Sequence, residues 1–128
     1  MKRPIDLARR FLELADRDIK AFRKLALDRE IDDAVVGFHA QQAVEKCLKA
    51  VLARHEVAFR KVHDLSALID LLGDKRLPFP PMREKVVELN PFAVLLRYDF
   101  PETEALDRAM AKDVVDAVRR WAEDSVAK

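Results

Sequence analysis

Apolar residues recur along the first part of the chain at the spacing of a helix face. Between Pro4 and Leu27 they follow one another in steps of one, three or four residues, which places them on one side of an α-helix. Pro4 suits the first helical position, where a missing N–H needs no partner. The sequence therefore predicts a first helix over about residues 4–27. Its apolar stripe comprises Ala8, Phe11, Leu12, Ala15, Ile19, Phe22 and Ala26.

A second helix is predicted from about Asp33 to Arg54, and its apolar arc is wide. Asp32 or Asp33 is placed to cap this helix by accepting the free N–H groups of its first turn. Apolar residues fill roughly half of the circumference, more than one neighbouring helix needs. We expect this helix to lie centrally, or to be shared between the core and a subunit interface. The arc comprises Val36, Ala40, Ala43, Val44, Cys47, Leu48, Val51 and Leu52.

Polar residues, a glycine and prolines divide the middle of the chain into shorter segments. A short third helix is predicted over residues 64–73, between an aspartate cap and a terminating glycine. A fourth helix begins near Met82. Asn90 and Pro91 then either start a further helix, with Asn90 as its cap, or Pro91 kinks the fourth one. Both alternatives end this part of the chain at residues 97–101.

The last predicted helix runs from about Glu102 to Asp124, with Thr103 as its cap. Short loops between the segments favour antiparallel neighbours. We therefore predict an all-α protein, an up-and-down antiparallel bundle of four or five helices that forms one domain over residues 1–128. The apolar stripe of the last helix comprises Leu106, Ala109, Met110, Val114, Ala117, Val118 and Trp121.

The composition excludes several classes of function. The chain has 128 residues, half of them apolar, which suits a single domain with a core. Gly37 and Gly73 are the only glycines and lie far apart, so no glycine-rich phosphate loop can form. A single cysteine excludes an intramolecular disulfide and a multi-cysteine zinc site. Cys47 belongs to the apolar arc of the second helix, where we expect it to pack as a small core residue.

Charge and hydropathy further limit the possible ligands and the cellular location. The 24 basic and 23 acidic residues leave a net charge of +1, so the chain carries no overall nucleic-acid footprint. No stretch is long and apolar enough to predict a membrane span, and charges interrupt the N-terminal segment, so no secretory signal is expected. A single cysteine favours the reducing cytoplasm. His39, His55 and His63 show no metal-binding spacing, so neither a metal nor a cofactor is expected.

A polar row of His39, Gln42 and Lys46 is the first candidate for a binding site. The three residues recur at helical spacing on one side of the second helix. An imidazole, an amide and a cation together can bind a phosphate or the edge of a base. The same row can also be a solvated face, or it can hold a histidine that is buried at an interface.

Two further candidates lie at predicted helix ends. His63 precedes the third helix, where it either packs back on the bundle or titrates near neutrality, and the adjoining Asp64 is explained as a cap. Arg97, Tyr98 and Asp99 form the other group. Arg97 either bonds to the last carbonyls of its own helix or contacts a phosphate with two N–H groups.

Three of these stretches resemble, in the same order, motifs of the HEPN family (higher eukaryote and prokaryote nucleotide-binding domain). Residues 38–50 are similar to its signature helix, and residues 63–65 resemble its His-Asp-Leu motif. Residues 88–90, followed by residues 97–99, resemble its Glu-Leu-Asn and Arg-Tyr-Pro-Asp stretches. The resemblance implies an antiparallel helical bundle that homodimerises, with a cleft at the dimer interface.

The resemblance also implies partners and an activity. Family members often accompany a minimal nucleotidyltransferase in toxin–antitoxin or related pairs, and some are metal-independent ribonucleases. Those ribonucleases use an arginine that is followed a few residues later by a histidine, near the start of the last helix. No histidine follows Arg97 in this chain, so the general acid or base of the family's nuclease is not carried over.

Two hypotheses of different classes follow, with a weaker third. In the first, the chain is a homodimeric module that presents Arg97, Tyr98, Asp99 and the polar row to a nucleotide, an RNA or a partner nucleotidyltransferase. In the second, it is a metal-independent endoribonuclease. Arg97 at the dimer interface would then stabilise the charge on phosphorus, and His39 or His63 would move the proton. The third is a structural adaptor without a ligand.

Overall fold

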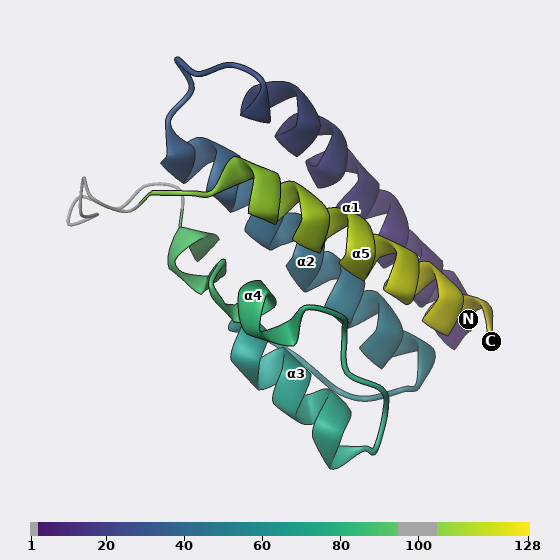
Figure 1. The fold of residues 1–128 in the computed structure, drawn as a ribbon. Helices are drawn as coiled ribbons and strands as arrows, with labels where there is room; N and C mark the ends of the chain where they lie inside the picture. Colours follow the sequence, from purple (N-terminus) through teal and green to yellow (C-terminus); the bar gives the residue numbers. More distant parts are fainter. Residues whose placement is uncertain (1–2, 95–104) are drawn as a thin grey trace.

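Helices make up the architecture of the computed structural model, which describes residues 3–94 and 105–128 (Figure 1). No strand occurs within these ranges. Three long helices pack against one another, and shorter ones cover the remaining side of the central helix. The predicted all-α bundle is therefore confirmed. The elements are α1 (Pro4–Ala26), α2 (Asp33–Arg54), α3 (Leu65–Asp74), α4 (Arg83–Val87), the 3₁₀ helix η1 (Asn90–Ala93) and α5 (Arg108–Ala127).

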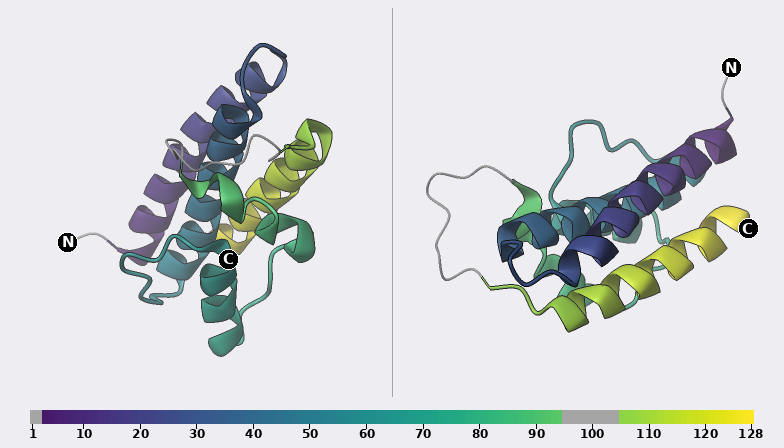
Figure 2. Two further views of the ribbon diagram at one scale, coloured as in Figure 1. Left: turned by 90° about the vertical axis from the view of Figure 1, so that its left-hand side faces the viewer. Right: turned by 90° about the horizontal axis from the view of Figure 1, so that it is seen from above.

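α2 is the centre of the bundle. It packs against α1, α5, α3 and η1, and the left view of Figure 2 shows it between α1 and α5. Val36, Ala40 and Leu48 have no exposed surface. Contacts within one chain thus account for the wide apolar arc, and the expectation of a central helix is confirmed.

The direction of the long helices follows from their end contacts. Asp33 at the start of α2 pairs with Arg108 at the start of α5. At the opposite end, Arg54 of α2 donates to the backbone carbonyl of Val126 in α5. α2 and α5 therefore run in the same direction, because the segment from α3 to η1 returns the chain to the start of α2 (Figure 1). α1 runs antiparallel to both.

The predicted capping of α2 is wrong in its hydrogen bonds. Asp32 occupies the cap position, but its side chain makes no capping bond. The Asp33 carboxylate turns instead to α5, where it accepts from the backbone N–H of Leu106 at 3.1 Å and from Arg108 at 3.0 Å. The Asp33 carboxylate thus accepts from donors that are distant in sequence, and neither aspartate caps the first turn of α2 with its side chain.

Arg108 binds the turn between α1 and α2 to the start of α5. Besides pairing with Asp33, its guanidinium donates to the backbone carbonyls of Ala26 at 3.1 Å and Asp28 at 2.9 Å, and to the carbonyl of Ile31. Carbonyls at a helix C-terminus have no partner within the helix, so a cation there satisfies them. One side chain therefore closes the end of α1 and holds the following turn.

The region after α3 decides between the two alternatives for Pro91. α4 ends at Val87, and η1 begins separately at Asn90 with Pro91 in its first turn, so a further helix starts here and the kinked alternative is wrong. The predicted cap role of Asn90 is also wrong. Leu89 holds the cap position, and the Asn90 side chain reaches across to the start of α3.

The last helix begins later than predicted. α5 starts at Arg108 rather than near Glu102, and Asp107 is its cap, accepting from the N–H of Met110 at 3.0 Å. Leu106 precedes the helix, and its N–H donates to Asp33. The predicted cap Thr103 lies outside the described residues, and so does the predicted end at residues 97–101.

Candidate functional site

The polar row of α2 meets a carboxylate of α1. Asp18, on the edge of the apolar stripe of α1, is only 9 % exposed. One of its oxygens lies 3.0 Å from Nδ1 of His39, and the other accepts a hydrogen bond from Nζ of Lys46. The side chains of His39 and Lys46 are each 25 % exposed. The three residues form an acid–base cluster where α1 and α2 meet the surface.

The bonding of His39 sets what this cluster can do. A carboxylate at Nδ1 fixes the tautomer of an imidazole and leaves Nε2 as its free acceptor. No described residue bonds Nε2 of His39. Lys46 adds a cation beside the ring, held by the same carboxylate. The cluster can therefore bind an anionic oxygen through Lys46 and exchange a proton at Nε2.

Hydrogen bonds connect Gln42 of the polar row to a second group of polar residues. Its amide donates to Gln41 Oε1 at 2.7 Å, and Gln41, which is fully buried, donates to Glu45 Oε1 at 3.2 Å. The other oxygen of Glu45 accepts from Lys49 at 3.0 Å and lies 3.3 Å from Nδ1 of His63. The His63 side chain is 69 % exposed, so it contacts α2 only at its ring nitrogen and on a different carboxylate from His39, and the prediction that it packs back on the bundle is wrong.

The start of α3 joins the other two motif stretches. Asp64 is confirmed as the cap, because its carboxylate accepts from the N–H groups of Ser66 at 2.8 Å and Ala67 at 3.3 Å. The Asn90 side chain accepts from the N–H of Leu65 at 2.9 Å and donates to Asp64 at 3.2 Å. Residues 63–65 and 88–90 are therefore bonded together beside the signature helix.

Arg97, Tyr98 and Asp99 lie outside the described residues, so their place relative to the polar row stays a prediction. Asp18 and Glu45 are the residues that the sequence interpretation missed. For Asp18 a signal was available, because a carboxylate on the core-facing side of an amphipathic helix needs a partner when it is buried.

Cys47 is a core residue. It is 1 % exposed, and burial raises the pKa of its thiol to about 12. A thiol that stays protonated at neutral pH is a poor nucleophile, so the predicted packing role is confirmed. Among the residues that the structure describes, no group of His, Cys, Asp and Glu is arranged to hold a metal ion. None of the described helices is long and apolar enough to cross a membrane.

The structure is thus an all-helical domain with a central helix, α2, and two carboxylate–histidine pairs beside that helix. The family model of the HEPN domain matches residues 8–125. The chain belongs to the HEPN family. Neither the curated proteins nor the solved structures provide a match.

Proposed function

We propose that this HEPN-domain chain is a homodimeric binding module for a nucleotide, an RNA or a partner protein, paired with a minimal nucleotidyltransferase in a toxin–antitoxin-like system. The observation that carries the proposal is the Asp18–His39–Lys46 cluster, a partly exposed imidazole and ammonium positioned by one carboxylate. Phosphate oxygens suit such donors. Arg97, Tyr98 and Asp99 complete the proposed ligand site, with Gln42 and His63 beside it.

The homodimer and the nucleotidyltransferase partner are supported by family membership rather than by packing. The apolar arc of α2 is covered within one chain and needs no second copy. A binding role is favoured over catalysis because no histidine follows Arg97 at the family's spacing. The cytoplasm suits a chain with one buried, reduced thiol.

A metal-independent ribonuclease is the second candidate, and one observation favours it. Asp18 bonds Nδ1 of His39 and leaves Nε2, which no described residue bonds, as the nitrogen that can act as a general base. In this reaction Nε2 of His39 takes the proton of a ribose 2′-OH, and that oxygen attacks the adjacent phosphorus. A cyclic phosphate forms, the 5′-oxygen leaves and takes up a proton, and Arg97 stabilises the charge on phosphorus.

One experiment separates the two functions. A labelled mixed-sequence RNA is incubated without metal, with chelator, and with the wild type, Arg97→Ala and His39→Gln. We expect binding without cleavage, weakened in both variants, while Arg17→Ala on the exposed side of α1 binds normally. Cleavage that disappears in both variants would establish the ribonuclease instead. Thermal melts of each variant ensure that folded proteins are compared.

Two measurements test the remaining parts of the proposal. Light scattering at micromolar concentration is expected to give the mass of two chains, and a monomer would contradict the homodimer. Failure to bind nucleotides and RNA at any concentration would leave only the partner-protein part of the proposal. In that case the structural adaptor becomes the better description.

A further inference from the structure

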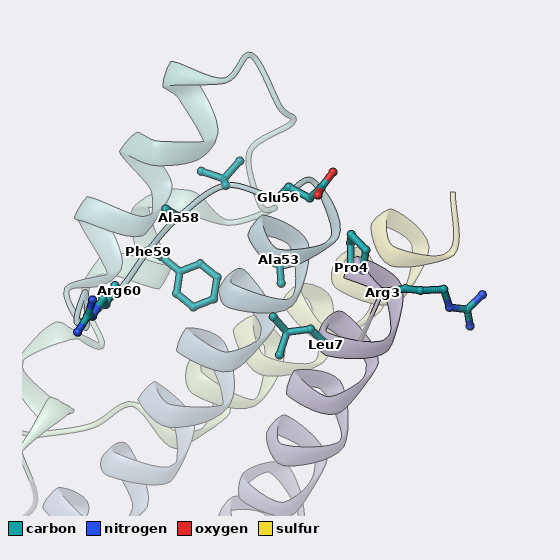
Figure 3. A pocket seen from close by; sticks show the side chains of 9 residues that line it. Arg3, Pro4, Leu7, Ala53, Glu56, Ala58, Phe59 and Arg60 are labelled. Carbon is teal, nitrogen blue, oxygen red and sulfur yellow. The ribbon is translucent and has the colours of Figure 1, made fainter. Parts of the chain in front are cut away.

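A groove of about 520 Å³ lies between the N-terminus of α1 and the loop that follows α2 (Figure 3). Leu7 of α1 forms one wall, Phe59 of the loop forms the other, and Ala53 of α2 lies on the floor. Leu7 is 41 % exposed, which is high for a leucine beside a core. Arg3 and Arg60 stand at opposite ends. The groove is separate from the Asp18–His39–Lys46 cluster.

The Phe59 wall is held in place by the fold. Its ring packs edge-on against Phe11 with centroids 5.5 Å apart, and Nζ of Lys49 lies 5.7 Å from its centre. Glu56 and Lys61, on either side of the wall, have the left-handed backbone conformation with φ of 58° and 60°. At Glu56 this conformation ends α2, with the N–H of Val57 donating to the carbonyl of Leu52 at 2.9 Å, so backbone hydrogen bonds fix the start of the loop. The groove therefore exists before a ligand arrives.

The charges around the groove favour an extended, acidic occupant. Figure 3 shows the side chains of Arg3 and Arg60 directed outward, away from the cavity. A ligand contained within the groove would meet mostly carbon, whereas a longer chain would pass both cations. Arg3 pairs with Asp6 in an exposed contact that is easily exchanged. No described carboxylate pairs with Arg60, and Glu56 is the one acidic residue of the lining.

We infer that the groove docks an acidic amphipathic segment of a partner protein. One large apolar side chain of the partner lies between Leu7 and Phe59, and flanking carboxylates reach Arg3 and Arg60. Apolar anchors held in a preformed groove with charges at its rim are a common mode of peptide recognition. A nucleic acid suits the groove poorly, because its floor offers carbon where phosphates need donors. The inference rests on the partner-binding part of the proposed function and names the surface and chemistry of that partner.

The test uses fluorescein-labelled amphipathic peptides with leucines on one face and glutamates beside them. A matched set carries lysines in place of the glutamates. Fluorescence anisotropy with the full chain is expected to show saturable binding of the acidic set only. Leu7→Glu and Arg60→Glu, both at exposed positions, should each weaken binding about tenfold or more. Arg17→Glu makes the same charge reversal on α1 outside the groove and should leave binding unchanged.

Several results would overturn the inference. They are the absence of saturable binding, equal binding of acidic and basic peptides, or equal losses in Arg17→Glu and the groove variants. A homodimer that Leu7→Glu dissociates would make the occupant a second copy of this chain. RNA binding is measured on the same samples. Peptide binding without RNA binding would refute the nucleic-acid part of the proposed function and leave the groove, and the reverse would refute the groove alone.

Discussion

The ring of Phe92 packs directly on the backbone of Gly37. A Cβ at position 37 would lie 2.3 Å from Cδ1 of that ring, closer than carbon atoms approach without displacement. Phe92 is only 3 % exposed, so neighbouring side chains hold the ring against α2. A glycine within α2 therefore determines where η1 packs.

Gly37→Ala is expected to destabilise the fold although alanine is the better helix former. Glycine in a helix normally costs about 1 kcal/mol relative to alanine. Overpacking against Phe92 should outweigh that gain and lower the free energy of unfolding by about 1–3 kcal/mol. Urea denaturation measures the change.

Gly73→Ala is the matched control for that substitution. Its Cβ would lie 3.1 Å from Cζ of Phe79, whose side chain is 44 % exposed and free to shift. We expect a much smaller loss there. Equal losses at the two glycines, or a gain at Gly37, would contradict the packing argument.

Asp18→Asn should destabilise the fold by removing the charge that holds His39 and Lys46. A half-buried donor left without its partner costs about 1–3 kcal/mol. Glu13→Gln removes an equivalent carboxylate from the exposed pair with Arg10 and should change stability by less than about 1 kcal/mol. Chemical denaturation of both variants gives the comparison, and similar values would show that the Asp18 cluster adds nothing to the fold.

Asn90→Ala should loosen the start of α3 at one specific amide. The N–H of Leu65 loses its acceptor, whereas those of Ser66 and Ala67 keep Asp64. We expect a loss of about 1 kcal/mol, typical of a helix cap. Hydrogen exchange should quicken more at Leu65 than at Ser66. A uniform increase along α3 would mean that Asn90 supports the whole helix instead.

The buried thiol of Cys47 predicts a decline of stability in alkali. Its pKa is raised from 9.0 to about 12 in the folded chain, mainly by burial. Between these values the unfolded chain loses a proton that the folded chain keeps, so the folded state loses stability as pH rises. The slope is about 1.4 kcal/mol per pH unit. Denaturation between pH 9 and 11 should show this extra slope relative to Cys47→Ala, and parallel curves would refute it.

Local signals in the sequence are sufficient to predict most of the helices. The bounds of α1 and α2 and the cap at Asp64 depend on periodicity and on neighbouring residues, which a sequence displays directly. Asp33 and Asn90 were misassigned as caps, because each bonds to an element more than twenty residues away. Competition between a local cap and a distant partner is decided by tertiary packing.

The candidate site could be predicted only in part, again because tertiary contacts decide which residues pair. The polar row follows from helical spacing, but its pairing with Asp18 joins two helices across 21 positions of the chain. The second carboxylate, Glu45, stands within the signature helix and shows no sign in the sequence that His63 will meet it. Periodicity places residues on a face and leaves their partners on other elements undetermined.

The carbonyls that Arg108 binds belong to a turn between adjacent helices, yet the side chain that satisfies them comes from the start of α5. Contacts made nearby in sequence usually form early and open independently. This turn instead reaches its final hydrogen bonding only when α5 docks, and it loses that bonding when the start of α5 frays. We therefore expect the hairpin of α1 and α2 and the beginning of the last helix to open and close as one cooperative unit.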